Sequence, residues 1–203
     1  FDRVFDSNTN QKSLFDEAAK PVINDILFGY NGTIFTYGQS GSGKTHTMYG
    51  NSLYDDENKG ILPRTVEIIF GFIQSPDNQN IKFQIKFSML EIYKECLYDL
   101  LNPEVDSKEL KIKETKDKQV YVKNLTEEYI TNIEEFLLLI DQADQYRVVS
   151  ETGLNKQSSR SHLLFIIEVL QQLPDGSERC GKLNLIDLAG SEKVTKTGAV
   201  GEI

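Results

Sequence analysis

The stretch Gly38-Gln39-Ser40-Gly41-Ser42-Gly43-Lys44-Thr45 decides which fold this sequence predicts. It has the pattern of a phosphate-binding loop, in which four residues separate a glycine from Gly-Lys-Ser/Thr. The β-branched and aromatic run Thr33–Tyr37 precedes it and predicts a buried strand, and Lys44–Met48 can begin a helix. Because strand, loop and helix follow in the order that the motif requires, the alternative of a chance Gly/Ser turn is disfavoured.

Each part of this loop has a role in holding phosphate. Glycines let the backbone close around the oxyanions, and the N–H groups at the start of a helix favour negative charge. Lys44 is expected to reach the β- and γ-phosphates, and the Thr45 hydroxyl is expected to ligate Mg²⁺. The sequence therefore predicts a nucleoside triphosphate site.

Composition narrows the class of protein. The 203 residues include 22 Lys and Arg against 31 Asp and Glu, so the formal net charge of −9 argues against a nucleic-acid-binding protein. The hydrophobic share of 39% is ordinary for a single soluble domain, which we assign to residues 1–203. Cys96 and Cys180 lack paired spacing, which favours a reduced compartment over a disulfide scaffold or a zinc site.

The ends of the chain and its hydrophobic runs give further expectations. No run approaches the length of a membrane span and no signal peptide is visible, so membrane insertion is not expected. The sequence begins at Phe1 without an initiator Met and stops at Ile203 in a polar stretch. We interpret it as a fragment that is incomplete at both ends.

Hydrophobic periodicity predicts the elements on either side of the loop. A short strand is expected over Phe1–Asp6, followed by a helix over Gln11–Leu27 that is kinked or broken at Pro21. Residues 50–60 are polar and are expected to form a solvated insertion, after which a second helix starts at Leu62-Pro63-Arg64. The clearest strand is Ile81–Met89, in which apolar and polar residues alternate.

In the second half of the chain, residues 110–129 suggest a small lysine-rich hairpin, and Thr131-Asn132-Ile133-Glu134 predicts a capping box before a long helix. Residues 163–170 and 182–188 predict two paired strands. Strands that alternate with helices around a phosphate-binding loop predict a three-layer α/β fold of the P-loop NTPase type. We expect a central, mostly parallel sheet flanked by helices, and the 163–188 hairpin makes that sheet mixed rather than purely parallel.

Two further groups of residues are candidates for contacts with the metal ion and the phosphates. Leu183–Leu188 is an apolar strand that ends in Asp187, and an Asp placed beside a phosphate-binding loop can hold Mg²⁺ directly or through water. Gly190 then leaves a backbone N–H free to sense a γ-phosphate. The polar run Asn155-Lys156-Gln157-Ser158-Ser159-Arg160-Ser161-His162 is costly to bury unless it meets a charged group, although composition alone also permits a surface turn.

Taken in order, the phosphate loop, Asn-x-x-Ser-Ser-Arg-Ser-His and Asp-Leu-Ala-Gly-Ser-Glu resemble the motor domain of the kinesins, over essentially all 203 residues. The flanking stretches Tyr30–Phe35 and Ser191–Ala199 most resemble the conventional heavy-chain class. The resemblance implies ATP hydrolysis with Mg²⁺, coupled to stepping on microtubules, and a cytoplasmic, cytoskeletal location.

The resemblance also implies roles for individual residues. Ser158, Ser159 and Arg160 match the first switch, in which Ser159 approaches Mg²⁺, and Asp187, Gly190 and Glu192 match the second. Arg160 is expected to pair with Glu192 and so to position the attacking water. His46 falls where the family packs a side chain near the adenine, although an ordinary surface helix residue is the alternative.

The chain departs from the family pattern in informative ways. Gln157 stands where the family usually has His, at a position that is not a motif ligand. The adenine-lining Arg-x-Arg-x-x-Pro stretch would precede Phe1, and the main track-binding helix and the neck linker would follow Ile203. The remaining candidate microtubule contacts are Lys123, Lys193 and Lys196, each of which is also compatible with a solvated surface lysine. We expect the fragment alone to be poorly active and unable to walk.

Two other classes of function stay open at this stage. A GTP-binding switch also has a phosphate loop and Asp-x-x-Gly, but it requires Asn-Lys-x-Asp, and neither Asn58-Lys59 nor Asn155-Lys156 is followed by that Asp. A non-motile binding module is disfavoured because every expected catalytic residue is present.

Overall fold

A six-stranded mixed sheet forms the centre of the computed structural model, which describes residues 1–116, 118–150 and 160–192. Its strands follow the order β1 (Gly32–Thr36), β8 (Glu178–Asp187), β7 (His162–Gln172), β2 (Lys82–Tyr93) and β3 (Cys96–Asp99), and β6 (Glu128–Ile130) also pairs with β2. The mixed α/β class is confirmed.

Most pairings among the described strands are antiparallel, so the expectation of a mostly parallel sheet is wrong for this part of the chain. Only β1 and β8 run parallel, whereas β2–β3, β2–β6, β2–β7 and β7–β8 are antiparallel. For the β2–β3 pair the reason is local. Lys94 and Glu95 join β2 to β3 with positive φ angles of 49° and 62°, and such two-residue turns connect only antiparallel neighbours.

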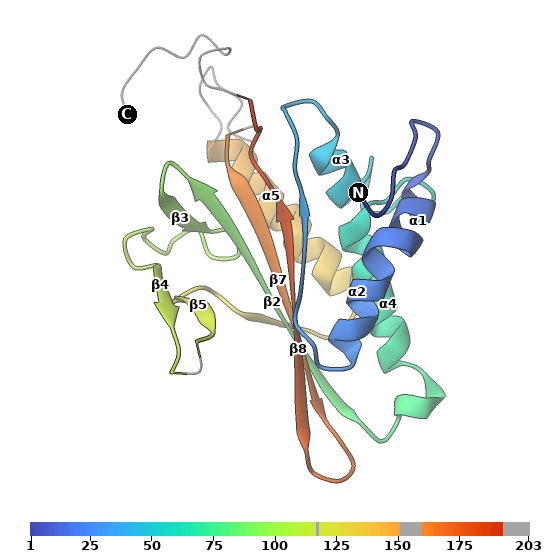
Figure 1. Ribbon diagram of the computed structural model, residues 1–203. Coiled ribbons are helices and arrows are strands. Elements are labelled where there is room, and N and C mark those ends of the chain that lie inside the picture. The colour runs from blue at the N-terminus through green and yellow to red at the C-terminus, as the bar shows by residue number, and fades with distance from the viewer. Residues whose placement is uncertain (117, 151–159, 193–203) are drawn as a thin grey trace.

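The helices pack against one face of this sheet (Figure 1). Phe87 of β2 meets Phe136 of α5 with ring centroids 4.7 Å apart, and Tyr49 of α3 meets Phe165 of β7 at 5.5 Å. These rings belong to one continuous hydrophobic core. The helical elements are α1 (Gln11–Leu14), the π-helix η1 (Phe15–Ala19), α2 (Lys20–Leu27), α3 (Lys44–Tyr49), α4 (Ile61–Ile73), the 3₁₀ helix η2 (Pro76–Asn78) and α5 (Ile133–Ser150).

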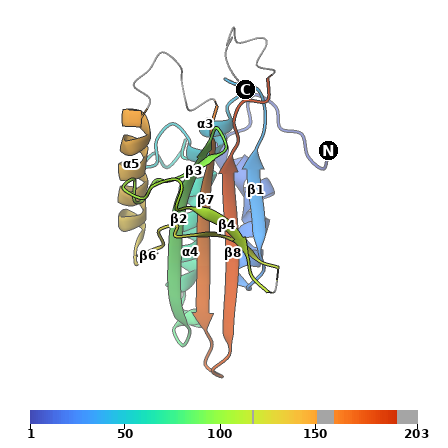
Figure 2. The ribbon, with the colours of Figure 1, turned by 90° about the vertical axis from the view of Figure 1, so that its left-hand side faces the viewer.

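The opposite face of the sheet carries the predicted hairpin, formed by β4 (Lys111–Glu114) and β5 (Val120–Lys123), which lies in front of the sheet in Figure 2. Within the described ranges no helix covers this face, so the second helical layer of a three-layer arrangement is not formed there. None of the helices in the described ranges is long and apolar enough to cross a bilayer.

The first helix is interrupted, as Pro21 predicts, but the irregular turn comes before the proline. The Lys20 N–H donates to the carbonyl of Phe15, five residues back, and this gives the π-helical turn η1. Proline has no N–H and its ring crowds the carbonyl four residues earlier, so the preceding turn widens. Residues 1–6 form no strand, because they pair with none of the described strands; Phe1 and Val4 lie exposed.

The capping box lies one residue later than predicted. Asn132, rather than Thr131, caps α5, because its side-chain oxygen accepts the Glu135 N–H at 2.8 Å. Glu135 in turn accepts from the N–H and the hydroxyl of Thr131 at 2.8 and 2.9 Å. Asn and Thr can both cap a helix, so sequence alone leaves this one-residue shift open.

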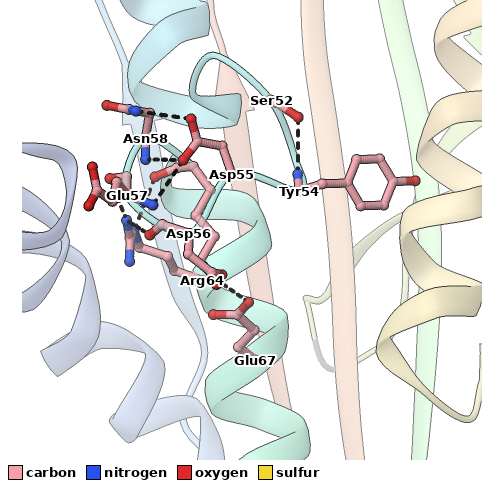
Figure 3. Close-up of polar contacts among 9 residues, drawn as sticks. Ser52, Tyr54, Asp55, Asp56, Glu57, Asn58, Arg64 and Glu67 are labelled. Atoms are coloured by element: carbon pink, nitrogen blue, oxygen red, sulfur yellow. Dashed lines mark hydrogen bonds and ion pairs between the residues drawn. The ribbon is translucent and has the colours of Figure 1, made fainter.

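Residues 50–60 are not a simple solvated insertion, because they are organised around Asp55 (Figure 3). The carboxylate of Asp55 accepts the N–H groups of Glu57 and Asn58 at 3.0 and 3.1 Å and the Asn58 side-chain amide at 2.9 Å. These hydrogen bonds lower the pKa of Asp55, mainly through Asn58. Asp at the start of such a turn is a common stabilising device.

Arg64 ties this turn to α4. Its guanidinium donates to the carbonyl oxygens of Lys59, Asp56 and Glu57 at 3.1, 3.0 and 3.0 Å, and the residue is only 8% exposed (Figure 3). Lys59 is also buried and forms ion pairs with Asp56 and Glu67. This packing could not be predicted from the polar composition of the segment, because the acceptors of the Arg64 hydrogen bonds are backbone carbonyls.

Replacing Arg64 by Met is expected to lower the free energy of unfolding by about 1–3 kcal/mol, because three backbone carbonyls lose the charged donor of a buried side chain. Urea denaturation measures the change. Arg3→Met is the matched control, since Arg3 makes an exposed ion pair with Glu17 that is worth less than about 1 kcal/mol. Equal losses in the two variants would show that Arg64 does not hold the turn.

Candidate functional site

The phosphate-binding loop has the predicted strand–loop–helix setting. β1 ends at Thr36, and α3 begins at Lys44. Gly41 and Gly43 have φ angles of +76° and +93°, which L side chains rarely adopt, so glycine is required at these two positions. The expectation that this strand is buried is wrong: β1 lies at the edge of the sheet as the structure describes it, and Phe35 is 60% exposed.

The end of β8 lies directly beside the loop. In the parallel register Thr36 is opposite Asp187, and the Leu188 N–H donates to the Thr36 carbonyl at 3.3 Å. The Ser191 N–H donates to the Gly38 carbonyl at 3.0 Å. These long-range backbone bonds bring the Asp-Leu-Ala-Gly segment to the phosphate loop, as the motif order predicts.

Asp187 and Thr45 meet at this junction. The Thr45 hydroxyl donates to Oδ2 of Asp187 at 2.5 Å, and Asp187 is only 5% exposed. A hydroxyl and a carboxylate are the hard oxygen donors that Mg²⁺ prefers, so the two residues fit the predicted metal site. No group of three or more His, Cys, Asp and Glu residues in the described ranges could hold a metal ion.

Lys44 is oriented within the loop itself. Its ammonium group donates to the carbonyl of Gln39 at 3.0 Å. This contact keeps the ammonium over the loop, where a bound phosphate chain would replace a neutral carbonyl by a stronger, charged partner.

Glu192 occupies the loop in this structure. Its carboxylate accepts the Ser40 N–H at 2.8 Å and also the Ser40 hydroxyl. Both contacts, with the nearby charge of Lys44, lower the pKa of Glu192, so the carboxylate stays ionised at neutral pH. At Gly190 a Cβ would lie 2.4 Å from the Ser40 hydroxyl, so a larger residue there would displace the side chain of Ser40.

The predicted pair of Arg160 and Glu192 is not formed here, because Glu192 is bound to Ser40, and Arg160 is exposed. Ser158 and Ser159, also predicted for this site, lie outside the described residues. His162, the last residue of the same motif, accepts the Ala189 N–H on Nδ1 at 3.1 Å. The two switch motifs therefore touch through His162 rather than through Arg160.

Two groups missed by the sequence reasoning, Glu91 and Arg147, hold the start of β7 together with Ser161. The Ser161 hydroxyl donates to Glu91 Oε1 at 2.6 Å, and Arg147 of α5 forms an ion pair with the same carboxylate at 3.2 Å. Glu91 and Ser161 are almost fully buried. The available signal was the alternation of β2 itself, because Glu91 falls two residues after Met89, at a position where the pattern predicts an apolar side chain.

The predicted adenine contact, His46, has a partner that was also missed. Gln11 at the start of α1 donates to the His46 carbonyl at 2.6 Å and lies 3.1 Å from Nδ1 of its ring. No sequence pattern connects these two residues. Of the candidate microtubule contacts, Lys123 is exposed on β5, whereas Lys193 and Lys196 lie outside the described residues.

Comparison with known proteins supports the resemblance. The family model "Kinesin motor domain" matches residues 1–203. Kinesin-related protein 5 of Dictyostelium discoideum is 49% identical over 205 residues, which cover 99% of this chain and 20% of that protein. The kinesin-1 heavy chain of Homo sapiens is 47% identical over 204 residues, which cover 100% of this chain and 21% of that protein.

A solved structure of a fast kinesin has a TM-score of 0.92 to this fold at 45% identity, over 100% of this chain and 56% of that one. The chain spans about a fifth of the length of the curated relatives named above. Family match, sequence identity and fold agree over all the residues compared. This chain belongs to the kinesin motor domain family.

Proposed function

We propose that this chain is the nucleotide-binding part of a motor that hydrolyses ATP and moves along microtubules. The observation that carries the proposal is the junction of Thr45, Asp187 and Gly190, where two motifs far apart in sequence meet beside the phosphate loop. The relatives support the choice of reaction, since the solved fast kinesin is described in terms of ATPase mechanism and interactions with microtubules.

In the proposed reaction the loop residues Gly38–Thr45 bind the triphosphate, with Lys44 on the β- and γ-phosphates. Thr45 and Asp187 hold Mg²⁺, joined by Ser159. The metal, when bound, neutralises charge on the phosphates. Gly190 offers its N–H to the γ-phosphate, and His46 packs near the adenine.

Glu192 has two partners in this proposal. In the structure it occupies the Ser40 N–H, a backbone donor of the phosphate loop. Phosphate binding displaces the carboxylate, because two anions cannot share one donor at low cost. Glu192 is then free to pair with Arg160 and to position the attacking water, together with Ser158. Catalysis comes from positioning and electrostatics rather than from a nucleophilic side chain.

For microtubule binding, we propose that Lys123, Lys193 and Lys196 contact acidic tubulin. Lys123 of β5 is paired across the hairpin with Lys111 of β4, so two positively charged residues are cross-strand neighbours. With microtubules as its partner, the proposed location of the protein is the cytoplasm, on the cytoskeleton.

The test is ATP turnover by the full-length protein with and without polymerised tubulin, and with GTP in place of ATP. Strong stimulation by the polymer with ATP as the preferred nucleotide is the expected result. Turnover that ignores the polymer, or GTP bound far more tightly than ATP, would contradict the proposal.

A further inference from the structure

Thr36, the last residue of β1, faces the same carboxylate as Thr45. Its hydroxyl lies 3.0 Å from Oδ1 of Asp187 and 3.5 Å from the carbonyl oxygen of Ile186. The hydroxyl has a single hydrogen, and the nearer, charged acceptor is the stronger one. Thr36 therefore donates to Oδ1 of Asp187, while Thr45 donates to Oδ2.

This arrangement gives each oxygen of a buried carboxylate its own hydroxyl donor. The two donors come from different elements, Thr36 from β1 and Thr45 from α3, and together they fix the rotation of the Asp187 side chain. The parallel register, in which Thr36 is opposite Asp187, brings the first donor into place.

The orientation of Asp187 determines which way the Thr45 hydroxyl points. While the Thr45 hydrogen is directed at Oδ2, the lone pairs of its oxygen face away from the carboxylate and are available to a cation. Mg²⁺ demands near-ideal octahedral geometry, so it is sensitive to this orientation. Groups that orient metal ligands typically change metal affinity by about 10–100-fold.

We propose that Thr36 is a positioning residue for the magnesium site: its hydroxyl fixes the Asp187 carboxylate and, through it, the hydroxyl of Thr45. The inference rests on the proposed function, because it needs a Mg²⁺–nucleotide complex at this loop. It adds a residue outside the three motifs, on the strand that precedes the phosphate loop.

The experiment measures binding of fluorescently labelled ADP to the full-length protein, first in EDTA and then during titration with MgCl₂. Thr36→Val keeps the shape of the side chain and removes the hydroxyl. It is expected to raise the Mg²⁺ concentration for half-maximal tightening of the nucleotide about tenfold. The affinity in EDTA is expected to stay within about twofold of the wild-type value, since Thr36 acts only through the metal site.

Two further variants separate positioning from structural damage. Thr36→Ser retains the hydroxyl and is expected to restore the wild-type Mg²⁺ midpoint. Thr33→Val is the matched control, because Thr33 lies on the same strand, with its hydroxyl accepting from Asn184 at 3.3 Å on the face away from Asp187. It is expected to leave the midpoint unchanged.

An unchanged midpoint in Thr36→Val would overturn the inference. So would a Thr36→Ser midpoint displaced as far as that of Thr36→Val, or equal loss of affinity in EDTA and in Mg²⁺, because either result would mean general disruption of the loop. A wild-type protein that binds no nucleotide in either condition would instead contradict the proposed function, and the inference with it.

Discussion

Replacing Lys44 by Ala is expected to weaken ATP binding about 100-fold, which corresponds to about 2.8 kcal/mol. The reason is the loss of a charged donor aimed at the β- and γ-phosphates, where hydrogen bonds to ionised groups are strongest. In the structure Lys44 donates to the Gln39 carbonyl, a neutral acceptor at the surface, so Lys44→Ala should lower the free energy of unfolding little. Equilibrium binding of a fluorescent ATP analogue measures the affinity.

Lys12→Ala is the matched control for the change of charge. Lys12 lies on α1 and makes an exposed ion pair with Asp16, one turn along the helix. Its removal should leave ATP affinity unchanged. If the two variants lost affinity equally, the effect would come from net charge and not from contact with phosphate.

Replacing Glu192 by Ala is expected to lower ATP turnover by about 100- to 1,000-fold, the size of the effect when a preorganised transition-state contact is removed. Nucleotide affinity should be at least as high as in the wild type, because the Ser40 N–H is no longer occupied by a carboxylate. Single-turnover hydrolysis and equilibrium binding, measured on the same preparation, separate these two effects.

Glu178→Ala serves as the control, since Glu178 is an exposed residue at the far end of β8, outside the site. It should alter neither quantity. If Glu192→Ala lost binding as severely as Lys44→Ala does, the division of roles between holding phosphate and positioning water would be wrong.

Local sequence patterns predicted much of this fold. The alternation in Ile81–Met89 predicted β2, which in the structure runs on to Tyr93. The runs 163–170 and 182–188 predicted the β7–β8 hairpin, and the phosphate loop predicted α3. Each of these features depends on residues close together in the chain, where periodicity and turn chemistry are informative.

The wrong predictions concern features that depend on contacts with distant or backbone groups, which local sequence patterns do not reveal. The hydrophobic pattern of Phe1–Asp6 predicted a strand, but a strand requires a pairing partner, and these residues pair with none of the described strands. Residues 50–60 were expected to be solvated because they are polar, yet Arg64 organises them through backbone carbonyls that no side-chain pattern reveals.

The sequence by itself determined the phosphate-binding loop, the family and the identity of the candidate ligands Thr45 and Asp187, because these depend on residue types at fixed spacings. Only the tertiary structure decided that Thr36 faces Asp187 and that Glu192 reaches Ser40. The first pair is separated by 151 positions in the sequence and the second pair by 152. Such contacts depend on strand order and register, and a slip of one residue would turn Thr36 to the opposite face of the sheet. Local propensity carries no information about that choice.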